Sequence, residues 1–231
     1  HVEVYSRYLH EKVQLVYPLN PHLKSLLDNV ISDSRWDMTY LGMQVLIEGL
    51  ALAAFGLIRN MATEPLAKAL NAYVMQDEAR HVMFGRLALR DYYPQLTEAE
   101  RDNREEFCVE ACYLMRDRFL GEEVYERLEL PPEISEYVDK SDNLRIFRSY
   151  LFMRIVPILK DIGLWGPRIR GAFEEMGILE FADTDIDKEM ADDEAAAEQL
   201  DRDRDIRLAH VEKVAHQSEA TEAEEAGLGL G

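Results

Sequence analysis

The stretch "LGMQVLIEGLALAAFGLI", residues 41–58, is the longest apolar run of the chain and carries one acid, Glu48, near its middle. Apolar residues seven and three positions before Glu48, and four and seven positions after it, place this acid on the apolar face of a helix. These residues are Leu41, Val45, Leu52 and Phe55. A lone buried carboxylate costs several kcal/mol unless it is paired, protonated or bound to a metal. Glu48 therefore needs a partner from elsewhere in the fold.

The same run just reaches the roughly 17–25 residues that span a membrane. Its central carboxylate and the lack of a basic flank favour a buried core helix instead. The two cysteines, Cys108 and Cys112, are four residues apart in a helical pattern, which favours two buried thiols over a disulfide. We therefore expect a cytoplasmic protein without a membrane partner.

Capping and proline signals divide the whole chain into helices. Asparagine then proline at 20–21 starts one helix, Thr63 with Pro65 starts another, and "TEAE" at 97–100 has the pattern of a capping box. No segment alternates as a strand would. The expected helices span 1–16, 21–30, 33–61, 64–92, 98–128, 142–162 and 167–176. The chain is predicted to be all-α, with helices long enough for a bundle.

Charge separates the end of the chain from the rest. The net charge is −19, and the last 49 residues, with 16 acids and 5 bases, contribute −11 of it. Such an acidic chain offers no basic stripe for nucleic acid. We predict a helical bundle over 1–128, accessory helices packing on it over 129–182, and an acidic, largely disordered tail over 183–231.

A second motif, "QDEARHVMFG" at 76–85, places acids and a histidine on an apolar helix face. Glu78 and His81 are three residues apart, so they project from one side of the helix and can reach one ion. Val74 and Val82 on the same side predict that this side faces the core. Chance alone gives almost one Glu-x-x-His pair in a chain with this many Glu and His residues, so the motif by itself carries little weight.

The opening of the chain, "HVEVYSRYL", echoes "HVMFGRLAL" from His81 onward, with identities at His1, Val2 and Leu9. A buried Glu on one long helix and Glu-x-x-His on the next form half of a carboxylate-bridged dimetal site in a four-helix bundle. His1 matches the last residue of a second Glu-x-x-His motif. The echo is the internal repeat that such a bundle would show.

These motifs resemble those of the ferritin-like di-iron carboxylate superfamily. The resemblance covers residues 1–92 and is strongest to the oxygenase and oxidase branch, which includes the ribonucleotide reductase small subunit and the aminobenzoate N-oxygenases. The metal ligands that it implies are His1, Glu48, Glu78 and His81. It also implies that Asp77 bonds the ring of the opposite ligand histidine, which would fix its tautomer and orientation.

The resemblance carries expectations for cofactor and activity. It implies two iron ions, or a manganese and an iron, held by carboxylate oxygens and imidazoles. The expected protein is an oxidoreductase that activates O₂ to oxidise a small organic substrate and receives electrons from a donor protein. The resemblance leaves open whether the chain forms a homodimer. The family's first-helix carboxylate and the Glu three residues before His1 have no counterpart here. We therefore expect a fragment, a ferritin-like bundle lacking its first one and a half helices, whose site is incomplete.

Two alternatives come from other functional classes. A ferritin-like protein can bind iron without acting on a substrate, because a fold does not fix a function. A helical interaction module can instead hold Glu48, Glu78 and His81 as a metal-free buried polar network.

Overall fold

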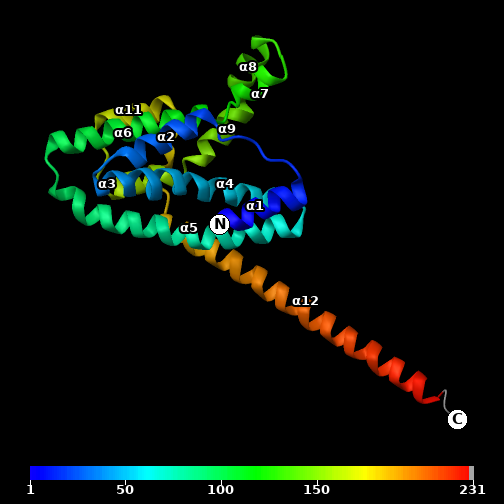
Figure 1. Cartoon of the computed structure of the whole chain (residues 1–231). Coiled ribbons are helices and arrows are strands. Elements are labelled where there is room, and N and C mark those ends of the chain that lie inside the picture. Colours follow the sequence, from blue (N-terminus) through cyan, green and yellow to red (C-terminus); the bar gives the residue numbers. More distant parts are fainter. Residues whose placement is uncertain (229–231) are drawn as a thin grey trace.

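The computed structural model describes the backbone of residues 1–228, and the side chains of residues 1–206, 208 and 209. Within these residues the chain is helical and contains no strand, which confirms the all-α prediction. Figure 1 shows a bundle of helices, a small lobe made by α7 and α8, and the long helix α12 leading away from the bundle.

The centre of the bundle is a pair of long helices that lie side by side (Figure 1). The first is continuous from Trp36 to Met61 and consists of α3 (Trp36–Thr39), the π-helical segment η2 (Tyr40–Ile47) and α4 (Glu48–Met61). The second is α5 (Pro65–Tyr92). The first of them is long and apolar enough to cross a membrane by length and composition, but half of its most apolar window is buried in the protein.

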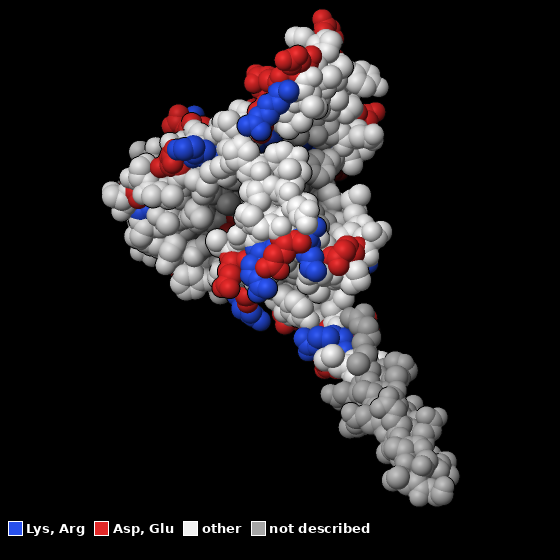
Figure 2. All heavy atoms as spheres, turned by 45° about the vertical axis from the view of Figure 1, so that its right-hand side comes forward, with Lys and Arg blue, Asp and Glu red and all other residues white. Residues whose placement is uncertain are grey.

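The remaining helices pack against this pair or extend from it. They are α1 (Val2–Tyr8), η1 (Leu9–Val13), α2 (Pro21–Ser32), η3 (Tyr93–Gln95), α6 (Glu98–Asp117), α7 (Glu122–Arg127), α8 (Pro132–Asp139), α9 (Asp142–Leu151), α10 (Ile155–Asp161), α11 (Pro167–Glu175), η4 (Leu179–Asp183) and α12 (Ile186–Leu228). On the face shown in Figure 2, acidic and basic side chains are interspersed and form no basic stripe.

The predicted helix starts agree with the structure at two of the three caps. The Asn20 side chain accepts hydrogen bonds from the first turn of α2, and Thr97 and Glu100 form the capping box of α6. The third cap is Glu64 rather than Thr63, because the Glu64 carboxylate accepts the free N–H groups of the first turn of α5. The positive end of the helix dipole also stabilises an acid at this position.

Two predicted helices are interrupted in the structure. The helix expected over 98–128 ends at Asp117, and Gly121 turns the chain with a φ of 68°, a conformation that favours glycine. The helix expected over 142–162 breaks after Leu151. The second piece, α10, then runs through the centre of the core, with Ile155 fully buried. Burial of α10 therefore decides where the chain turns.

The end of the chain also differs from the prediction of a largely disordered segment over 183–231. Helix α12 extends from Ile186 to Leu228, while residues 229–231 lie outside the described part. Its first turns are anchored because Ile186 is buried and the buried carboxylate of Asp193 bonds Arg154 at 2.7 Å. The acidic composition of this segment gave no indication of these two contacts.

Close packing between α2 and η2 depends on Gly42. A Cβ atom at this position would overlap Cγ2 of the buried Val30. We expect Gly42→Ala to lower the free energy of unfolding by about 1–3 kcal/mol, measured by urea denaturation. The matched control is Gly171→Ala on α11, where nothing lies within 4 Å of an added Cβ. There the change should be neutral or stabilising by up to about 1 kcal/mol; equal losses at both sites would contradict this packing.

Candidate metal centre

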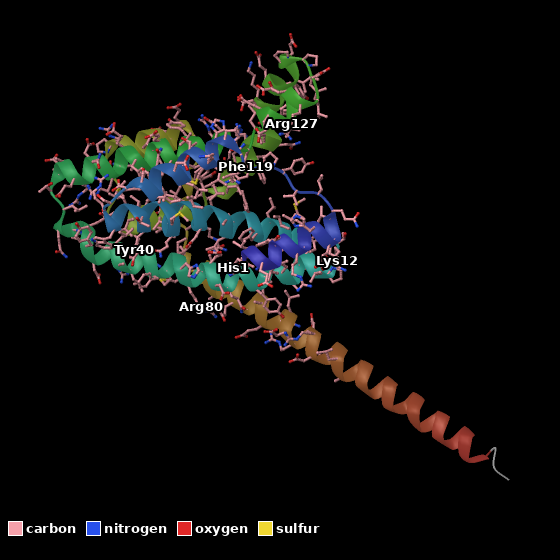
Figure 3. All side chains as sticks on the ribbon, in the orientation of Figure 1. His1, Lys12, Tyr40, Arg80, Phe119 and Arg127 are labelled. Atoms are coloured by element: carbon pink, nitrogen blue, oxygen red, sulfur yellow. The ribbon has the colours of Figure 1, made fainter. Side chains whose placement is uncertain are left out.

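The structure brings the five residues singled out from the sequence together at the middle of α5. Glu48 is the first residue of α4, Asp77, Glu78 and His81 come from α5, and His1 lies directly before α1. Figure 3 shows His1 between α1 and α5. Glu48 follows the π-helical segment η2, a local widening of the helix that often occurs at functional sites.

Helix α1 is held on the central pair by one aromatic residue. The ring of Tyr5 stacks on Phe55 of α4 with centroids 5.5 Å apart, and its hydroxyl donates to Asn71 of α5 at 3.0 Å. Tyr5 lies one helical turn after His1, so these contacts fix the start of α1 over α5. Phe55 and Asn71, which are not members of the cluster, thereby set the position of His1.

Glu78 lies between the two histidines. One of its carboxylate oxygens is 2.8 Å from Nδ1 of His1, and the other is 3.2 Å from Nδ1 of His81. The same nitrogen of His81 is 3.8 Å from Oε2 of Glu48. One ligand atom each from Glu48, Glu78 and His81 lie within 4.8 Å of one another, a spacing that can hold a metal ion.

The carboxylates form the inner side of the cluster and the imidazoles the outer side. The side chains of Glu78 and Glu48 are 13% and 20% exposed, compared with 31% for His1 and 52% for His81. A small molecule can therefore approach the cluster from the side of His81.

Glu48 lacks a partner for its buried oxygen. Its Oε2 atom is inaccessible to solvent and makes no hydrogen bond within the described residues. Burial raises the pKa of the Glu48 carboxyl, the nearby charge of Glu78 raises it further, and His81 lowers it in part. A buried carboxylate oxygen without a donor, facing a second carboxylate, is the feature that a cation would satisfy.

Asp77 holds the ring of His1 from the other side. Its Oδ2 is 3.2 Å from Nε2 of His1, and its Oδ1 accepts a hydrogen bond from Arg80 at 2.8 Å. Both ring nitrogens of His1 therefore face carboxylates. Because Asp77 occupies Nε2, the nitrogen of His1 that faces Glu78 and the centre of the cluster is Nδ1.

Gln44 is a member of this neighbourhood that the sequence reasoning did not single out. Its Oε1 is also buried without a hydrogen-bond partner within the described residues. It precedes Glu48 by one helical turn and packs against Gly85, where a Cβ would lie 2.8 Å from the Gln44 Cβ. The available signal was a polar residue within the apolar run, four positions before Glu48.

The donor set fits hard or borderline divalent metals. Two carboxylates, Glu48 and Glu78, and two imidazoles, His1 and His81, without a thiolate, suit iron or manganese better than soft metals. Their net charge with neutral histidines is negative, which divalent cations would compensate. Among the residues that the structure describes, Glu48, Glu78 and His81 are the group with metal-ligand spacing.

Comparison with known protein families, curated proteins and solved structures gives no match to this chain. Its function is therefore inferred from the chemistry of the cluster.

Proposed function

We propose that this protein is a di-iron oxidoreductase of the ferritin-like type, which activates O₂ to oxidise a small organic substrate. The observation that supports this most is the position of Glu78 between His1 and His81, beside the unpartnered buried oxygen of Glu48. A Glu on one long helix and Glu-x-x-His on its neighbour is the half-site of such bundles.

Each residue has a distinct role in this proposal. Glu78 directs one carboxylate oxygen toward each histidine, so Glu78 would hold both ions, and His1 and His81 would each hold one. Glu48 contributes its unpartnered oxygen, and Asp77 orients His1. With two reduced iron ions, or a manganese and an iron, bound here, the site would have the electrons to reduce O₂.

The surroundings of the cluster suit an oxidation. The helical turns next to Glu48 and Glu78 carry buried apolar residues, which would limit access of water: Val45, Leu52, Val74 and Val82. The exposure of His81 would let a substrate and an electron-donor protein approach the cluster. A cytoplasmic location is part of this proposal.

One observation favours a non-catalytic iron-binding protein as a second candidate. The 52% exposure of His81 would let an ion enter and leave without a substrate pocket. Consumption of O₂ with a reductant, which rises when a small aromatic or aliphatic substrate is added, would favour the oxidoreductase. Iron uptake without such consumption would favour binding alone.

The test of both iron proposals is anaerobic titration of the full chain with Fe(II), followed by metal analysis. We expect up to about two irons per chain, reduced at least to about half by Glu78→Ala, which removes the bridging carboxylate. The matched control is His10→Ala, because His10 is exposed and bonds only Ser6, one helical turn before it. Fewer than about one iron per chain in the parent protein would support the metal-free network instead.

A further inference from the structure

Helix α5 carries an exposed stripe on the side that the bundle does not cover. Residues Arg80, Phe84, Leu87 and Asp91 are spaced by four, three and four positions, which places them along one line of the helix, here called the α5 seam. All four are exposed, and the two apolar ones are 55% and 42% exposed, respectively. The seam thus has an apolar centre with a cation at one end and an anion at the other.

Aromatic rings from the neighbouring helix extend the apolar centre. Tyr40 packs against Phe84 with ring centroids 5.5 Å apart, and Trp36 packs edge-on against Tyr40 at 5.3 Å. Trp36 is itself 47% exposed. Figure 3 shows Tyr40 next to α5, on the side of His1 away from Lys12. The rings support one another, so the surface is preformed.

Helix α12 packs on α5 but leaves the seam free. It is bonded to α5 through Asp187 with Arg86 at 2.6 Å, and through Asp201 with Tyr73 at 2.6 Å. Arg86 lies on a different side of α5, and Tyr73 lies on the line of the seam but seven residues before its first member, Arg80. Phe84 and Leu87 stay exposed beside these contacts. Exposed aromatic and aliphatic side chains that are grouped on one surface, rather than scattered singly, mark an interaction surface.

The order of residues along the seam indicates the partner. A two-fold axis between residues 85 and 86 would oppose two antiparallel copies of α5, so that Phe84 meets the partner's Leu87. The same axis sets Arg80 against the partner's Asp91, and the contacts repeat in the reverse direction. Arg80 now pairs only with Asp77 on its own helix, and Asp91 makes no ion pair within the described residues. Asp91 is therefore available to pair across the axis, and the guanidinium of Arg80 has further N–H donors besides the one that bonds Asp77.

We propose that the α5 seam is the interface of a homodimer formed by antiparallel packing of α5 against α5 of a second copy. The register of Arg80, Phe84, Leu87 and Asp91 is self-complementary in apolar contacts and in charge. This interface does not depend on the metal site. It would, however, cover the surface next to His81, since Phe84 follows His81 by one helical turn.

The test is the mass of the full chain in solution, measured by light scattering and sedimentation equilibrium in the presence of a chelator. We expect twice the chain mass of 26.7 kDa. Phe84→Asp should raise the dimer dissociation constant by about 100-fold, because it places a charge in the apolar centre. The matched control is Tyr137→Asp on α8, a side chain that is 78% exposed and distant from the seam; it should leave the mass unchanged.

A charge exchange tests the register itself. Arg80→Asp or Asp91→Arg alone should each weaken the dimer by about tenfold, because each creates like charges across the axis. The double variant R80D/D91R restores opposite charges and should return the parent dissociation constant. Circular dichroism of each variant verifies that the exposed changes leave the helices folded.

Three results would overturn the proposal. They are a monomeric parent chain at high concentration, a dimer unaffected by Phe84→Asp, and a double charge variant as weak as the single ones. All three are measured without metal, so they are independent of whether the chain binds iron.

Discussion

Replacing Glu48 with glutamine is expected to weaken iron binding by at least about 100-fold while stabilising the metal-free protein. Glutamine keeps the size of the side chain but offers no negative oxygen to a metal ion. Loss of a residue that merely orients a metal ligand costs 10–100-fold in affinity, so loss of a ligand should cost more. The measurement is anaerobic Fe(II) titration of the parent and of E48Q.

The same change is expected to raise the stability of the metal-free protein, although it weakens iron binding. Without metal, Glu48 is a largely buried carboxylate facing Glu78, with one oxygen unpartnered. Glutamine removes the charge, and we expect a gain of about 1 kcal/mol in the free energy of unfolding at neutral pH. Urea denaturation with a chelator measures it.

The pH dependence of this gain follows from the raised pKa of Glu48. A group with a raised pKa in the folded state contributes stability that is present below its unfolded pKa and is lost as the pH rises. The advantage of E48Q should therefore be small below pH 4.5, the ordinary value for Glu, and should grow toward neutral pH. The control is Glu110→Gln, an exposed position on α6. An affinity for iron within about tenfold of the parent would exclude Glu48 as a ligand.

Asp37→Ala is expected to cause the largest loss of stability among single changes in the bundle, about 3–5 kcal/mol. Asp37 on α3 and Arg104 on α6 are 2% and 5% exposed and form two hydrogen bonds, of 2.9 and 3.3 Å. Removal of the carboxylate would leave the guanidinium of Arg104 buried without its partner. Urea denaturation of the metal-free protein measures the loss.

The control for this change is an exposed ion pair. Asp28 pairs with Lys24 within α2, and both side chains are more than 60% exposed. Asp28→Ala should change the free energy of unfolding by no more than about 0.5 kcal/mol. A loss below about 1 kcal/mol for Asp37→Ala would mean that the core relaxes and admits water to Arg104.

The sequence by itself determined the features that depend on neighbours within one helical turn. The all-α class follows from apolar periodicity and from the absence of alternating segments. The caps at Asn20 and Thr97 are local hydrogen bonds, so the residues that form them could be read directly. The shared faces of Glu48 with its apolar stripe, and of Glu78 with His81, follow from the period of the helix.

The tertiary structure alone decided which of these faces meet. His1 lies 77 positions from Glu78, and their contact depends on Tyr5 holding α1 against Phe55. Periodicity says that a face is apolar but not which helix covers it. The acidic α12 is helical at its start because Asp193 meets Arg154, and α10 turns into the core because its residues are buried there. These outcomes depend on contacts between segments distant in sequence, and such contacts leave no trace in local composition.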